Sequence, residues 1–119
     1  MLATHVEEGT NLVRIDFSGG LDAQEMIACR HVLQRVIDEH GSLRLLAHYG
    51  TVDMRHIEPR AFWEDLKNIG LIPHIHRCAI VADQAWLRRI SDAAGALLPS
   101  EVKTFELARE PEATTWLRG

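Results

Sequence analysis

The sequence of 119 residues has no apolar run near the roughly 20 residues that a membrane-spanning helix needs. It also has no cluster of lysine and arginine, and its net charge of −4 disfavours nucleic acid and anionic membrane surfaces as partners. The opening "MLATHVEEGT" lacks the basic start and the apolar core of a signal peptide. We therefore expect a cytoplasmic protein that neither inserts into membranes nor binds nucleic acid.

Cysteine is scarce, with Cys29 and Cys78 as the two examples. Cys29 falls in a helical pattern and Cys78 in a strand-like one. Lone cysteines of this kind usually act as small buried hydrophobes in a reducing compartment. We expect two free thiols rather than a disulfide.

Several motifs that carry chemistry are missing. Neither the G-x-G-x-x-G nor the G-x-x-x-x-G-K-[ST] order occurs, so the sequence offers no phosphate cradle for a nucleotide. The G-x-S-x-G elbow of serine hydrolases is absent as well. We predict no cofactor and no enzymatic activity.

The apolar residues that are present change period in a regular way, without repeats, low-complexity segments or linkers. Residues 1–119 are therefore predicted to form a single α/β domain with the order ββαβαβαβα. A hairpin is expected over 3–19, followed by strands over 43–49, 77–82 and 101–107, and by helices over 21–41, 59–70, 84–98 and 110–119. Helical crossovers favour parallel pairing, so we expect a mixed, mostly parallel five-stranded sheet with flanking helices, in which the first strand is antiparallel.

Glycine and apolar spacing support individual boundaries of these elements. Gly9 suits the turn of the hairpin, and Gly41 suits the C-terminal end of the first helix. Pro59 suits the first turn of the second helix. That helix is expected to bury Phe62, Leu66 and Ile69.

A family resemblance rests on the element order together with "FSGGLDAQE", "FWEDLKN", "HRCAIVADQAW", "EVKTFEL" and "EATTWL". These segments resemble the SpoIIAA-like family of small bacterial STAS/SEC14-type domains over nearly the whole chain. The resemblance implies the fold shared by anti-anti-sigma STAS domains and lipid-carrying CRAL-TRIO domains, without an established enzymatic activity. It implies a non-enzymatic interaction module that acts through a protein partner or a homodimer.

One departure from the anti-anti-sigma pattern bears on regulation. Those proteins carry a phosphorylatable serine at the start of the helix after the third strand, whereas "YGTVDMRHIEPRAF" contains none. A kinase-controlled switch is therefore not expected. Two alternatives to the interaction module stay open, namely a carrier of a small apolar or lipid-like ligand and an enzyme that uses the loop from His48 to His56.

Five residues are candidate contacts for a ligand or partner. In a parallel sheet, ligands favour the carboxyl ends of the strands, which points to His48, Tyr49, Asp53 and Asp83. Trp63 lies beside the apolar stripe of the second helix, and the segment "FWEDLKNIGLIP" has more apolar surface than one sheet face is expected to cover. We predict a homodimer through this helix.

Three alternate positions, His74, His76 and Cys78, resemble a metal site at first sight. Alternation places them on one side of an extended chain. However, Arg77 intervenes with a positive charge, and no second pair of ligands with zinc-site spacing occurs in the sequence. We predict no metal.

Overall fold

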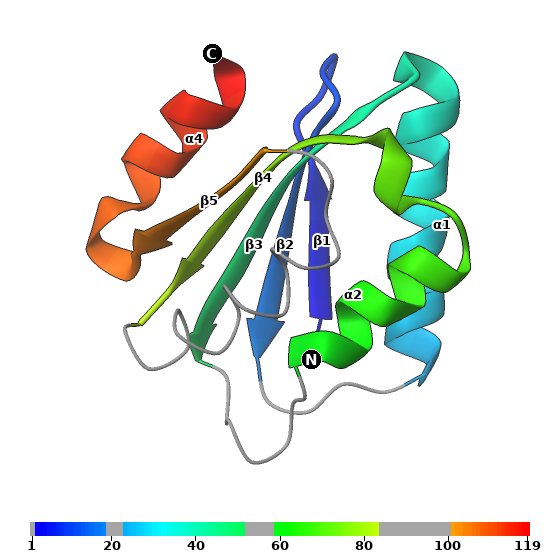
Figure 1. The fold of residues 1–119 in the computed structure, drawn as a ribbon, viewed down its shortest axis with the longest axis horizontal. Coiled ribbons are helices and arrows are strands. Elements are labelled where there is room, and N and C mark those ends of the chain that lie inside the picture. The colour runs from blue at the N-terminus through cyan, green and yellow to red at the C-terminus, as the bar shows by residue number, and fades with distance from the viewer. Residues whose placement is uncertain (1, 19–22, 52–58, 84–100) are drawn as a thin grey trace.

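The computed structural model describes residues 2–18, 23–51, 59–83 and 101–119, with side chains for all of these except 18, 50–51 and 59–63. The strands are β1 (Leu2–Val6), β2 (Leu12–Ser18), β3 (Leu43–Thr51), β4 (Ile75–Ala82) and β5 (Glu101–Glu106). The α-helices are α1 (Ala23–His40), α2 (Pro59–Asn68) and α4 (Glu110–Arg118), and the short 3-10 helices are η1 (Ile72–His74) and η2 (Leu107–Arg109). Figure 1 shows these elements around one sheet.

The sheet has the strand order β1-β2-β3-β4-β5. Strand β1 pairs with β2 in the antiparallel sense, and the other neighbouring pairs are parallel. The predicted mixed α/β sheet is therefore confirmed. Gly9, with a φ of 78°, lies in the hairpin turn, and Gly41, with a φ of 80°, follows α1. Both angles belong to the left-handed region that favours glycine, so these two boundaries follow from local chemistry.

Helices pack on both faces of the sheet. On one face, apolar residues of β2, β3 and β4 form a large core with α1 and with Leu66 of α2. On the other face, Ala113 and Leu117 of α4 cover a smaller apolar patch with Trp116 at its margin. The strand residues of this patch are Leu12, Leu46, Ala79, Val81 and Phe105. Because side chains alternate along a strand, each central strand contributes to both layers.

The end of α2 differs from the prediction. Leu66 is buried, but Ile69 is 39% exposed and lies beyond the last helical residue, so its predicted burial was wrong. Gly70 adopts a φ of 77° there, and the Leu71 N–H donates to the Leu66 carbonyl at 3.0 Å. This turn directs Leu71 and Ile72 into the core. These two residues therefore supply no apolar excess at the surface.

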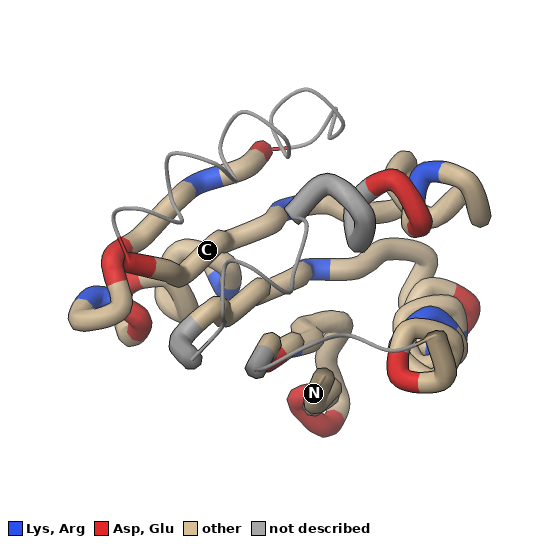
Figure 2. The backbone as a smooth tube through the Cα atoms, turned by 90° about the horizontal axis from the view of Figure 1, so that it is seen from below, with Lys and Arg blue, Asp and Glu red and all other residues tan. Residues whose placement is uncertain are grey.

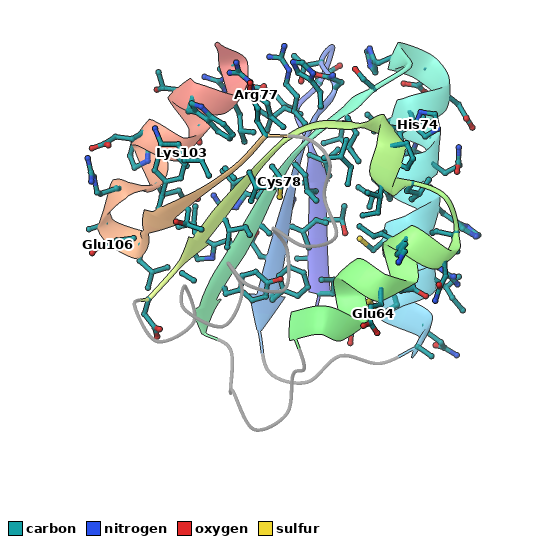
Figure 3. The ribbon with its side chains drawn as sticks, viewed as in Figure 1. Glu64, His74, Arg77, Cys78, Lys103 and Glu106 are labelled. Carbon is teal, nitrogen blue, oxygen red and sulfur yellow. The ribbon has the colours of Figure 1, made fainter. Side chains whose placement is uncertain are left out.

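The predicted alternation of His74, His76 and Cys78 was also wrong. His74 belongs to η1, and the pairing of β3 with β4 shifts between Leu43↔Ile75 and Arg44↔Arg77, leaving His76 as an extra residue. Ile75 and Cys78 are both buried in the core that contains α1, although they are three positions apart, so the shift puts the exposed His76 out of phase with Cys78. His74 comes from η1 and Cys78 from β4 (Figure 3).

Some predicted features fall on residues that the structure does not describe, and others concern the surface charge and the two thiols. The helix predicted over 84–98 and the candidate Asp53 lie outside the described residues. Acidic and basic residues are interspersed along the described chain (Figure 2). None of its described helices has the length and apolar character that crossing a membrane requires. Cys29 and Cys78 are free thiols, and burial raises the pKa of both.

Candidate functional site

A group of charged residues lies on the face of the sheet that carries α4. Arg14 and Asp16 alternate with the buried residues of β2, and His48 of β3 pairs in register with Asp16. Glu110, the first residue of α4, lies over this face of the sheet and contacts His48. We call His5, Arg14, Asp16, His48 and Glu110 the His48 cluster.

Ion pairs link every member of the His48 cluster. His48 Nδ1 lies 3.4 Å from Asp16 Oδ1, and its Nε2 lies 3.8 Å from Glu110 Oε2. Arg14 Nη2 lies 2.9 Å from Asp16 Oδ1, and Arg14 also pairs with Glu110. His5 Nε2 approaches Asp16 Oδ2 at 3.9 Å. Arg14 therefore forms ion pairs with both carboxylates that lie near His48, those of Asp16 and Glu110.

His48 is the titratable centre of this cluster, with a side chain that is 20% exposed. Burial lowers the pKa of His48 below its usual value, and the Arg14 cation lowers it further, while Asp16 acts in the opposite direction. His48 turns different ring nitrogens toward the two carboxylates, so the group does not converge on one point. Within the described residues, no three His, Cys, Asp or Glu side chains are arranged to hold a metal ion.

The lowered pKa of His48 predicts that the protein loses stability as the pH falls. The unfolded chain, with a histidine pKa of about 6.5, takes up this proton before the folded protein does. The free energy of unfolding should therefore fall between about pH 7 and about pH 5, and less steeply in His48→Gln. Urea denaturation across this range measures the effect.

Ile27→Ala is the control, because Ile27 is an exposed residue of α1 without a titratable group. It should keep the wild-type pH dependence. If His48→Gln declined as steeply as the wild type, the assigned direction for His48 would be wrong.

Two arginines hold the other end of α4. Arg44 Nη1 donates to the carbonyls of Leu117 at 2.8 Å and Arg118 at 3.2 Å. Arg77 Nη1 donates to the carbonyl of Trp116 at 2.7 Å (Figure 3). Cations at the C-terminal carbonyls of a helix oppose its dipole and satisfy acceptors that the helix leaves unpaired. Together with Glu110, these arginines attach α4 to the sheet at both ends.

A surface hollow of about 400 Å³ lies between α4 and β5. Its lining residues are Lys103, Phe105, Pro111, Glu112, Thr115 and Trp116. The rings of Phe105 and Trp116 are 6.1 Å apart and tilted by 53°, and the Arg77 guanidinium lies 5.2 Å from the centre of the Trp116 ring. We call this hollow together with β5 the β5–α4 surface.

A family model supplies the identity of the chain. The model described as SpoIIAA-like matches residues 12–118, which include β2 to β5 and α4. The chain belongs to the SpoIIAA-like family. No curated protein matches this SpoIIAA-like domain.

A solved structure supports the fold of the SpoIIAA-like domain. An uncharacterised protein from Shewanella loihica, described as having a SpoIIAA-like fold, is 16% identical to it with a TM-score of 0.70. The alignment covers 98% of this chain and 92% of that protein. At this identity the likeness concerns the fold alone.

The structure separates the candidate contacts that sequence analysis grouped. His48 belongs to the cluster beneath α4, whereas its neighbour Tyr49 is 1% exposed and stacks on Phe17 in the opposite core at 4.3 Å. Asp83 is exposed directly after β4. Trp63 belongs to α2, but its side chain is outside the described part of the SpoIIAA-like domain.

Sequence analysis missed Arg14, Asp16 and Glu110 as partners of His48, and it missed the hollow at Trp116. A signal for the first was available, since two charged residues alternate with Val13, Ile15 and Phe17 in β2. Charged side chains on a covered face of an interior strand need partners. Nothing in the sequence indicated which helix residue would meet them.

Proposed function

We propose that this SpoIIAA-like domain is a non-enzymatic interaction module that binds a protein partner at the β5–α4 surface. The observation that carries the proposal is the apolar hollow beside Trp116, next to a strand at the end of the sheet order. Aromatic side chains in preformed hollows are typical anchors of protein interfaces. The His48 cluster supports a non-enzymatic role, because Arg14 already engages both of its carboxylates.

Strand β5 supports the proposal through its main chain. It is the last strand in the order of the described sheet and pairs with β4 on one side. Its residues Lys103, Thr104 and Glu106 are exposed. A strand in this position can accept an extended segment of another protein through backbone hydrogen bonds, while side-chain hollows provide selectivity.

Trp116 supports the proposal because it is held in place before any partner arrives. Its carbonyl accepts a hydrogen bond from Arg77, whose guanidinium also lies over its ring. The ring of Phe105, on β5, contacts the Trp116 ring from the sheet. An aromatic group that is already ordered loses little conformational entropy on binding.

A display selection tests the proposal with random octapeptides on phage as the probe. We expect enriched peptides to bind the wild-type protein and to lose at least about tenfold in affinity for Thr115→Arg, which corresponds to roughly 1.4 kcal/mol. Thr115 is an exposed helix residue that lines the hollow, so a longer side chain there blocks it with little cost to folding. Fluorescence anisotropy of synthetic peptides measures the affinity.

Ile27→Ala is the control, since Ile27 is an exposed apolar residue on α1, away from this surface. It should bind as the wild type does. A selection without enriched peptides would refute the proposal, and peptides that bind Thr115→Arg equally well would refute the chosen surface.

The alternatives raised by the sequence have separate tests. The homodimer through α2 stays a prediction, although the buried Leu71 and Ile72 no longer support it, and sedimentation equilibrium decides it. The carrier of an apolar ligand also stays a prediction, and extra bound mass in native mass spectrometry would support it. The stacked pair of Phe17 and Tyr49 fills part of the core with side chains.

A further inference from the structure

We infer that the β5–α4 surface selects an extended protein segment in which an acidic residue stands two positions from a large apolar residue. The inference rests on the proposed function and adds the chemistry of the partner. The evidence comes from two side chains on the same face of β5, those of Lys103 and Phe105. Figure 3 shows the position of Lys103.

The sheet register fixes where these two side chains lie. Lys103 pairs with Ala79 of β4, and Phe105 pairs with Val81, so both belong to the face that α4 covers. Opposite residues of neighbouring strands have Cβ atoms about 4.5–5.5 Å apart, and residues two apart share a face. A segment that pairs with β5 would therefore place one side chain beside Lys103 and the side chain two positions away beside Phe105.

The position opposite Phe105 favours an apolar side chain. Phe105 and Trp116 both line the hollow, together with Pro111 from the first turn of α4. A large apolar side chain placed there would leave water and contact two tilted aromatic rings. Burial of this kind contributes most of the affinity at small interfaces.

The position opposite Lys103 favours a carboxylate. Lys103 is exposed, its ammonium lies 5.4 Å from the centre of the Phe105 ring, and the described residues supply it with no ion pair. The acidic residues nearby are already engaged, because Glu112 pairs with Arg109 at 2.8 Å and Glu101 pairs with Arg77 at 3.2 Å. A cation with unengaged charge at the rim attracts acidic groups and repels basic ones.

A second copy of this chain fits the surface poorly. In a symmetric antiparallel pairing that sets Glu101 of one copy opposite Lys103 of the other, the Glu101 carboxylate is already paired with Arg77, and no residue of the described β5 would reach Phe105. A symmetric pairing about Lys103 would instead bring two lysines together, which is unfavourable. The chemistry therefore favours a different protein as the partner.

The charge preference is tested by repeating the octapeptide selection with Lys103→Glu. Peptides selected on the wild type should carry Asp or Glu two positions from a large apolar residue, and those selected on Lys103→Glu should carry Lys or Arg there. Wild-type peptides should lose about three- to tenfold in affinity for Lys103→Glu at low salt, and less at high salt. Lys103→Met should lie between the two.

The control is Lys67→Glu, which makes the same charge change at an exposed position of α2. It should leave both the selected pattern and the affinities unchanged. Suppose that peptides are enriched and that Thr115→Arg abolishes their binding. If these peptides show no charge preference, or if those selected on Lys103→Glu still carry an acidic residue, the inference is wrong and the proposed function stands. If no peptide is enriched, the proposed function itself fails.

Discussion

Replacing Phe17 with alanine should lower the free energy of unfolding by about 3–5 kcal/mol. Phe17 is 1% exposed and stacks on Tyr49 at 4.3 Å with an interplanar angle of 1°. Truncation removes this contact and leaves a cavity in the core on the α1 face, which the rigid sheet cannot fill. Because a domain of this size is stable by only about 5–15 kcal/mol, a large shift of the urea midpoint is expected.

Ile27→Ala again serves as the control, because Ile27 is 42% exposed on α1 and its truncation should change stability by less than about 0.5 kcal/mol. The experiment also bears on Tyr49, which sequence analysis considered as a ligand contact. A loss below about 1 kcal/mol for Phe17→Ala would mean that this aromatic pair does not belong to a packed core.

Replacing Arg44 and Arg77, which bind the C-terminal carbonyls of α4, should cause the second largest loss of unfolding free energy. Hydrogen bonds to charged groups contribute roughly 1.5–3 kcal/mol each, and partial exposure reduces this, so Arg44→Met with Arg77→Met should cost about 2–4 kcal/mol. The carbonyls of Trp116 and Leu117 would lose their donors. Urea denaturation measures the total, and amide hydrogen exchange shows whether α4 opens first.

Replacement by lysine should restore only part of the loss, since an ammonium supplies the charge without the planar fork of the guanidinium. Arg35→Met, at an exposed position of α1, is the control for the loss of a surface cation. Unchanged protection of the α4 amides in the double variant would show that the arginines do not hold the helix.

Sequence reasoning succeeded where local chemistry decides the structure. Gly9 and Gly41 adopt the left-handed conformations that their positions required, and Pro59 belongs to α2 as expected. The unbroken apolar run of β4 indicated a strand covered on both faces, and the structure places it between β3 and β5. These features depend on residues that are neighbours in the chain.

It failed at one helix end and where the outcome depends on distant partners. Ile69 was expected inside because its spacing continued the stripe of α2, but the turn at Gly70 buries Leu71 instead. His48 was noticed as a polar residue after a strand, but its partners depend on the register with β2 and on the position of α4. The pairing of Asp16 with His48 is a property of the assembled sheet that no local pattern encodes.

The attachment of α4 has a consequence for synthesis of the protein on the ribosome. Strand β5 and helix α4 follow all the other described elements in the chain, and the ion pair of Arg118 with Glu7 joins residues 111 positions apart. Until they emerge, Leu46 and Val81 lack the cover that α4 provides, and β4 lacks β5 as its neighbour. An exposed apolar strand of this kind promotes aggregation, so incomplete chains that stop before residue 101 should depend on chaperones for their solubility.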